Sequence, residues 1–123
     1  MYKRQAQAAA ADESFKVILD EPWRMEKLNA NTQQYINGLK DMGFDTMLTE
    51  TAIVPVLCGS DERAFALTRE AQHQDVFVLP VVSPAVPEGL ARLRATITAA
   101  HETDEIAYAM DVIGKAGKEI GII

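Results

Sequence analysis

The sequence contains a single cysteine and no long hydrophobic run. Cys58 cannot form an internal disulfide, which is typical of a cytoplasmic protein, and one cysteine provides no basis for a metal site. The longest aliphatic stretches are interrupted by Pro55 and Pro80, and they are far shorter than the roughly 18 residues of a membrane span. We therefore expect a cytoplasmic protein with no metal centre and no membrane contact.

Positive charge is also scarce. Twelve Lys and Arg oppose eighteen Asp and Glu, which gives a formal net charge of −6. A nucleic-acid groove and an anionic membrane surface both need clustered positive charge, so the sequence argues against either partner. With 48% hydrophobic and 24% charged residues the composition is globular, and the length suits one hydrophobic core.

The first third of the chain is predicted to be helical. The first five residues fit neither a helix cap nor a strand, and we interpret residues 1–7 as a truncated or artefactual start. Alanine-rich composition and helical periodicity predict helices over 8–19 and from 23 to 42, which together form an arm over residues 8–43. The first helix carries an apolar stripe of Phe15, Ile18 and Leu19. Pro22 is predicted to end the first helix, and Gly43 is predicted to be the C-cap of the second.

Residues 44–123 alternate between strand-like and helix-like patterns. Pro55 has no N–H, so it predicts an edge position or a bulge in the first strand, and Ser60 predicts the N-cap of the following helix. We expect an α/β (α+β) fold in which helices pack on one face of a short sheet. The inner face of the helix after Ser60 is predicted to hold Ala64, Phe65, Thr68 and Ala71. The expected elements are a strand over 53–57, a helix over 61–72, strands over 76–79 and 91–98, and a helix that starts near 101–103 and frays at 114–117.

A proline-stiffened loop followed by two arginines is the most unusual segment. The loop can hold one wall of a binding site in place at little entropic cost, and Arg92 and Arg94 share one face of the strand that follows it. The planar guanidinium suits a carboxylate, because it forms two parallel charge-assisted hydrogen bonds. Considered alone, two arginines on an amphipathic strand more often form a solvated face.

This segment also carries a resemblance to a known family. Residues 51–56 read T-x-I-x-P-V, and residues 84–101 read P-x-V-P-x-G-x-x-R-x-R-x-x-x-x-A-x-H. Together they resemble the C-terminal domain of the α-oxoamine synthases, pyridoxal-phosphate (PLP) enzymes that include 8-amino-7-oxononanoate synthase, glycine C-acetyltransferase and serine palmitoyltransferase. The resemblance extends from Ala8 to about Ile113. It implies the C-terminal small domain of a fold-type-I PLP-dependent transferase.

The resemblance implies a reaction and a set of partners. Family members condense an acyl-CoA or acyl carrier with a small amino acid, release CO₂, and act as cytoplasmic homodimers. The second arginine of the R-x-R pair binds the amino-acid carboxylate in the family, and this role falls on Arg94. Pro84 and Val86 would form the loop wall beside it. Val82 stands where oxononanoate synthases and serine palmitoyltransferases often carry an arginine, so the resemblance does not specify the identity of the acyl substrate.

The lysines of the chain do not fit the cofactor chemistry of this family. Each one lies on a polar helical face or in the first seven residues, whereas a Schiff-base lysine needs burial or nearby cations. We therefore expect no catalytic and no cofactor-binding residue in this chain. The resemblance then implies that PLP is bound by a large domain upstream of this sequence. Residues 8–43 would be the helical arm from the end of that large domain, and residues 44–123 would be the small C-terminal domain. This C-terminal fragment is therefore predicted to be inactive alone.

A second interpretation needs no enzyme. The order strand, helix, strand, strand, helix also suits a non-catalytic ferredoxin-like module that binds a small molecule at the Gly59 turn, or a dimerisation module. The helical arm and the proline loop before Arg94 have no use in such a module, and they favour the enzyme.

Overall fold

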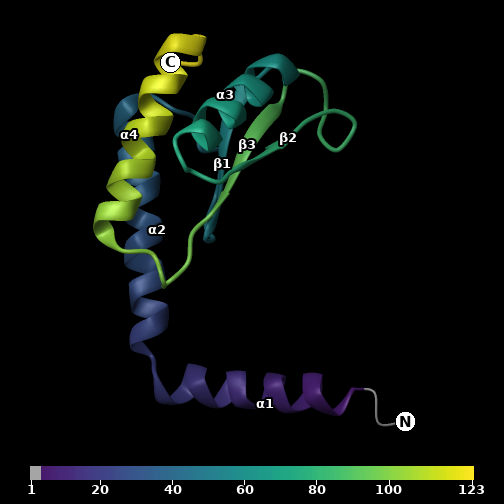
Figure 1. The fold of residues 1–123 in the computed structure, drawn as a ribbon, viewed down its shortest axis with the longest axis vertical. Helices are drawn as coiled ribbons and strands as arrows, with labels where there is room; N and C mark the ends of the chain where they lie inside the picture. Colours follow the sequence, from purple (N-terminus) through teal and green to yellow (C-terminus); the bar gives the residue numbers. More distant parts are fainter. Residues whose placement is uncertain (1–3) are drawn as a thin grey trace.

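The computed structural model describes residues 4–123 and has the predicted order of elements (Figure 1). Two helices precede a small α/β unit that contains three strands and two further helices, which confirms the predicted fold class. The elements are α1 (Gln5–Asp20), α2 (Trp23–Met42), β1 (Ile53–Gly59), α3 (Asp61–His73), β2 (Leu79–Val81), β3 (Ala91–Thr96) and α4 (Thr103–Ile120).

Helix α1 extends sideways from the lower end of α2 and contacts none of the sheet in Figure 1. It begins at Gln5, so residues 5–7 belong to the helix, while residues 1–3 lie outside the described part of the chain. None of its residues is buried, and the predicted apolar stripe faces solvent: Phe15 is 66% exposed and Leu19 is 80% exposed. The stripe therefore needs a surface that residues 4–123 do not supply.

This exposed stripe predicts self-association of the 123-residue chain. We expect sedimentation velocity to show oligomers that grow with protein concentration despite the net charge of −6. The double substitution Phe15→Ser, Leu19→Ser is expected to reduce the association, and Ala9→Ser on the same exposed helix is the matched control. A wild-type chain that stays monomeric over a hundredfold concentration range would contradict the prediction.

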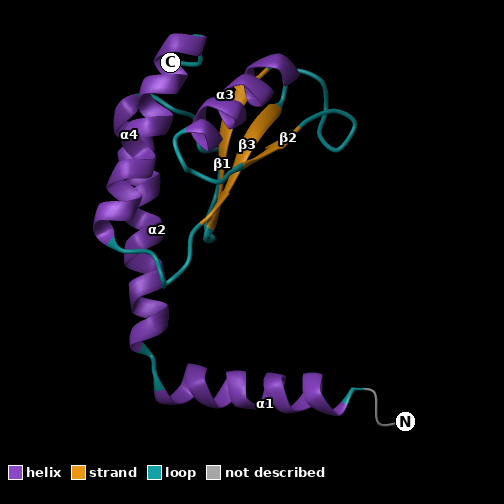
Figure 2. Cartoon of the chain, in the orientation of Figure 1, coloured by secondary structure: helices purple, strands orange, loops and turns teal. Residues whose placement is uncertain are grey.

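The sheet is antiparallel with strand order β1-β3-β2, so β3 lies in the middle (Figure 2). Pro55 lies in the edge strand β1, as its missing N–H predicts, and the register shifts between Leu57 and Gly59. The helix between β1 and β2 makes this a split βαβ unit, the arrangement with which a ferredoxin-like module begins. Residues 4–123 contain no fourth strand beside β1.

The second strand differs from its prediction. It covers Leu79–Val81 and passes through Pro80, whereas the sequence predicts residues 76–79. Residues 76–78 are bound to α3 instead, because the Val76 N–H donates to the Ala71 carbonyl and Gln72 Nε2 donates to the Val78 carbonyl at 2.9 Å. Pro80 is tolerated because β2 is an edge strand.

Helix α3 covers one face of the sheet, α4 packs on α3, and α2 packs on α4. Ser60 caps α3 as predicted, since its Oγ accepts the N–H of Arg63 at 3.3 Å. The predicted inner face of α3 is wrong at one position: Phe65 is 54% exposed and Leu67 is fully buried. Ala64, Leu67 and Ala71 share the buried face at helical spacing, and Phe65 is rotated away from it.

Helix α4 does not fray at residues 114–117 but continues to Ile120, and Gly121 ends it with φ of 86°. The glycines inside it bring α4 close to neighbouring segments. A Cβ atom at Gly114 would lie 2.8 Å from Met42 Sδ, and a Cβ atom at Gly117 would lie 2.4 Å from Phe44 Cζ. Both glycines are buried and serve close packing rather than helix termination.

Candidate functional site

The candidate site lies on the face of the sheet that no helix of residues 4–123 covers. Along β3, Ala91, Leu93 and Ala95 are buried, while Arg92 and Arg94 alternate with them. Successive side chains of a strand point to opposite faces, so both arginines point away from α3. The sheet register pairs Arg94 with Pro55 on β1 and with Leu79 on β2.

Arg94 has no hydrogen bond or ion pair within residues 4–123, and its side chain is exposed. Its cross-strand neighbours Pro55 and Leu79 are apolar, so no carboxylate of the sheet competes for the guanidinium. Arg92 differs, because its Nε donates to the Leu90 carbonyl at 3.1 Å. Arg94 is therefore the arginine available for a carboxylate from outside.

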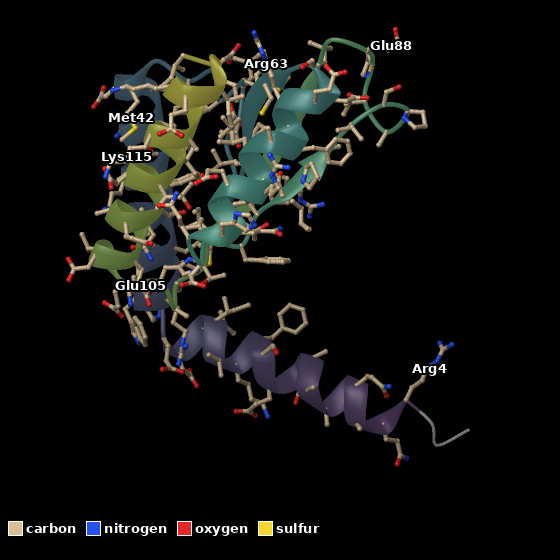
Figure 3. All side chains as sticks on the ribbon, turned by 45° about the horizontal axis from the view of Figure 1, so that its top comes forward. Arg4, Met42, Arg63, Glu88, Glu105 and Lys115 are labelled. Carbon is tan, nitrogen blue, oxygen red and sulfur yellow. The ribbon has the colours of Figure 1, made fainter. Side chains whose placement is uncertain are left out.

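The loop between β2 and β3 projects beyond the end of the sheet, with Glu88 at its outer part (Figures 1 and 3). Turns stabilise it: the Ala85 N–H donates to the Val82 carbonyl at 2.9 Å, and the Leu90 N–H donates to the Pro87 carbonyl at 3.1 Å. Pro84 is exposed and Val86 is half-buried. The loop joins β3 at the Arg92 end, so a wall formed by Pro84 and Val86 beside Arg94 stays a prediction.

A polar contact that the sequence did not reveal ties α2 to the turn after β3. Asn31 is 4% exposed, and its Nδ2 donates to the carbonyls of Thr98 at 3.0 Å and of His101 at 2.9 Å. In the same turn the Thr98 N–H donates to His101 Nδ1 at 3.1 Å. His101 thus stabilises the turn before α4. Asn31, a polar residue on the buried face of α2, was the signal available in the sequence.

Cys58 shows no sign of a reactive role. It lies in β1, is 4% exposed, and burial raises the pKa of its thiol to about 11. A nucleophilic cysteine needs a lowered pKa, so Cys58 serves as a small core residue. Within residues 4–123 there is no group of three or more His, Cys, Asp or Glu arranged to hold a metal ion. No helix among these residues has the length and apolar character to cross a membrane.

The comparison with family models matches residues 3–113 to the model described as aminotransferase class I and II. The chain belongs to the aminotransferase class I and II family. Curated relatives include 8-amino-7-oxononanoate synthase 1 of Bacillus velezensis, 41% identical over 118 residues, which are 96% of this chain and 30% of the relative. An 8-amino-7-oxononanoate synthase/2-amino-3-ketobutyrate coenzyme A ligase of Thermus thermophilus is 37% identical over 110 residues, 89% of this chain and 28% of the relative.

Solved structures agree with these relatives. A serine palmitoyltransferase from S. paucimobilis, solved with a bound PLP–myriocin aldimine, has a TM-score of 0.72 and 33% identity over 80% of this chain and 25% of that chain. The serine palmitoyltransferase of Sphingomonas wittichii has a TM-score of 0.74 and 29% identity over the same shares. These similarities confirm the resemblance to the α-oxoamine synthases. This aminotransferase class I and II chain spans about 30% of the length of the curated relatives first matched.

The lysines of this aminotransferase-family chain do not fit a Schiff base with PLP. Among the described residues, four are exposed: Lys16, Lys40, Lys115 and Lys118. Lys27 is partly exposed and donates to Glu102 Oε1 at 2.9 Å. Lys115, on the outer side of α4 (Figure 3), donates to Asp111 Oδ2 at 2.7 Å, and this hydrogen bond raises its pKa, the opposite of what a Schiff-base lysine needs. Lys3 lies outside the described residues.

Proposed function

We propose that this chain supplies the carboxylate-binding arginine of a PLP-dependent acyltransferase. The full enzyme would join the α-carbon of a small amino acid to the acyl group of an acyl-CoA or acyl carrier, releasing the thiol and CO₂. The relatives named as 8-amino-7-oxononanoate synthases and serine palmitoyltransferases support this class of reaction. The single observation that carries the proposal is the exposed, unpaired Arg94 on the open face of β3 in the described residues.

The contribution of this chain is binding and orientation. Arg94 lies in the central strand of the sheet, so hydrogen bonds on both sides fix the direction from which its guanidinium approaches a ligand. Pro55 and Leu79 beside it would exclude water once a second surface covers this face, and exclusion of water strengthens a guanidinium–carboxylate pair. We propose that the partners are a small amino acid and an acyl thioester, and that the full enzyme is a homodimer.

The residues that hold PLP are proposed to lie outside this chain, because the described lysines do not fit the cofactor. We accordingly place the large cofactor-binding domain upstream of the α1–α2 arm and assign residues 44–123 to the small domain. The non-catalytic ferredoxin-like alternative is supported only by the split βαβ unit, which does not account for Arg94 or the arm.

The 123-residue chain is expected to retain no PLP. After incubation with PLP, borohydride reduction and extensive dialysis, mass spectrometry is expected to find no single lysine modified at stoichiometric level, because lysines exposed to solvent react weakly and reversibly with the aldehyde. Low-level labelling spread over several lysines agrees with this expectation. A complete adduct on one lysine would show that the chain holds the cofactor itself.

The reaction class is tested with the longer protein that carries this sequence. Incubation with an acyl-CoA and glycine, alanine or serine is expected to release free thiol and CO₂ in equal amounts, and omission of the amino acid is expected to abolish both. Thiol release without CO₂, or no reaction with any of several acyl chain lengths, would contradict the proposal.

A further inference from the structure

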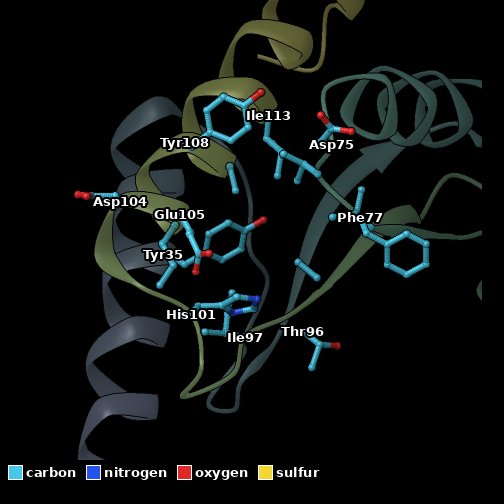
Figure 4. A pocket seen from close by; sticks show the side chains of 15 residues that line it. Tyr35, Asp75, Phe77, Thr96, Ile97, His101, Asp104, Glu105, Tyr108 and Ile113 are labelled. Carbon is cyan, nitrogen blue, oxygen red and sulfur yellow. The ribbon is translucent and has the colours of Figure 1, made fainter.

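A cavity of about 560 Å³ lies between α2, α4, the segment 75–78 and the far end of β3 (Figure 4). This volume is within the range of sites that bind small molecules. Its walls are mainly apolar: Val78 and Ile97 come from the sheet side, and Ile106 and Ile113 come from α4. Ala95 lines the cavity from the face of β3 opposite Arg94, and Thr96, the last residue of β3, also lines it. Neither Arg92 nor Arg94 is among the lining residues, so the cavity is distinct from the carboxylate site proposed above.

A buried hydroxyl without a partner lies in the wall of this cavity. Tyr35 on α2 is 2% exposed, and its Oη has no hydrogen-bond partner among the described residues. Burial raises the pKa of this phenol well above its usual value, so it stays protonated. In Figure 4 the ring of Tyr35 points from α2 toward the open centre of the cavity, with the hydroxyl at its inner end. Buried polar groups are nearly always paired, so this hydroxyl indicates a partner from outside the chain.

The mouth of the cavity is acidic. Asp75 and Glu105 lie on its two sides in Figure 4, while Asp104 points away, and none of the described lining residues is Lys or Arg. Both acidic positions are fixed by local structure. Asp75 follows α3 with φ of 63°, and Glu105 accepts the Glu102 N–H in the capping box of α4. The mouth therefore attracts cations and repels carboxylates and phosphates.

A hydrogen bond across the cavity joins its two sides. Tyr108 on α4 donates its hydroxyl proton to the Gln74 carbonyl at 2.9 Å, which joins α4 to the segment after α3. His101 closes the opposite end, where the Thr98 N–H fixes its ring. The cavity is thus bounded by hydrogen-bonded elements at both ends.

We propose that this cavity binds an amphiphilic organic ammonium compound whose apolar body carries a hydroxyl or carbonyl oxygen. The ammonium group would lie at the mouth near Asp75 and Glu105, the apolar body would contact the Val78, Ile97 and Ile113 side chains, and the oxygen would accept the proton of Tyr35. This goes beyond the proposed reaction, since it assigns a second ligand to the opposite side of β3.

Tyramine is the probe, because it has an ammonium group, an aromatic body and a hydroxyl at the far end. The controls are 2-phenylethylamine, which lacks the hydroxyl, and 4-ethylphenol, which lacks the charge. Calorimetric titration of the 123-residue chain is expected to give a Kd for tyramine about three to ten times lower than for 2-phenylethylamine, the effect of one neutral hydrogen bond. The preference over 4-ethylphenol is expected to fall with added salt.

Tyr35→Phe tests the hydroxyl directly. The substitution is expected to leave the unfolding midpoint unchanged or higher, because the hydroxyl it removes has no partner among the described residues, and to abolish the preference for tyramine over 2-phenylethylamine. Asp75→Asn is expected to weaken the binding of both amines and to leave the binding of 4-ethylphenol unchanged. Asp41→Asn, on α2 and away from the lining, is the matched control.

Amide chemical shifts locate the site. Addition of tyramine is expected to move the signals of Val78, Ile97 and Ile113 and to leave those of Arg92 and Arg94 in place. Equal binding of all three compounds, an unchanged preference in Tyr35→Phe, or shifts on the Arg94 face would overturn the proposal. Absence of binding by all three compounds would also overturn it and would favour a polypeptide segment as the occupant of the cavity.

Discussion

Arg94→Ala in the longer enzyme is expected to weaken binding of the amino-acid substrate by about one to three orders of magnitude. Removal of one member of a desolvated charge pair costs roughly 2–5 kcal/mol, because the carboxylate is left buried without its partner, and each 1.4 kcal/mol corresponds to about a factor of ten in Kd. We expect the pair to be desolvated in the longer enzyme, where a second surface would cover Arg94 together with Pro55 and Leu79 on the neighbouring strands. Spectroscopic titration with glycine, alanine and serine measures the effect.

Two variants separate a carboxylate contact from a general loss of structure. Arg94→Lys is expected to recover only part of the affinity, since an ammonium group cannot form two parallel hydrogen bonds with a carboxylate. Arg92→Ala lies on the same face of β3 and removes only the bond to the Leu90 carbonyl, so it is expected to leave amino-acid affinity nearly unchanged. Wild-type affinity in Arg94→Ala would show that the assignment of the carboxylate to Arg94 is wrong.

Gly117→Ala is expected to lower the free energy of unfolding by about 1–3 kcal/mol, the usual cost of overpacking a filled core. The added Cβ would lie 2.4 Å from Cζ of Phe44, which is 4% exposed and has a rigid ring. Alanine is the better helix former by roughly 1 kcal/mol, so the net loss measures how little Phe44 can move. Denaturant unfolding of the two proteins gives the difference.

Gly114→Ala is the matched control for this prediction. Its Cβ would lie 2.8 Å from Met42 Sδ, the far end of a flexible side chain that is 37% exposed and free to turn aside. The gain in helix propensity is expected to offset the contact, and the net change is expected to stay within about 0.5 kcal/mol. The double variant Gly117→Ala, Phe44→Leu is expected to be destabilised by less than the sum of its single changes. Similar losses in Gly114→Ala and Gly117→Ala would contradict this explanation.

The elements that the sequence predicted well are those with strong local signals. Pro22 and Gly43 mark the boundaries of α2 because proline disfavours helix continuation and Gly43 adopts φ of 103°. Ser60 caps α3 through its own side chain. The alternation of side chains in β3 places Arg94 on the face of the sheet opposite to that of the buried Leu93. These features depend on a few neighbouring residues, so they can be read from one sequence.

The features that were missed depend on residues far apart in the chain. The glycines of α4 resembled a helix end, and only their contacts with Met42 and Phe44 show that they allow close packing. Val76 and Val78 have a strand-like pattern, but hydrogen bonds with α3 prevail over sheet pairing. The cavity around Tyr35 is formed by four segments between residues 35 and 113, and no local pattern indicates a space between elements.

The two hydrogen bonds of Asn31 have a mechanical consequence. Since one amide group holds both the Thr98 and His101 carbonyls, the middle of α2 and the turn after β3 move as a single body. The ion pair between Lys27 and Glu102 adds a second attachment one turn nearer to α1. A displacement of α1 and the start of α2 is therefore expected to displace Thr98 as well, which lies four residues along the chain from Arg94.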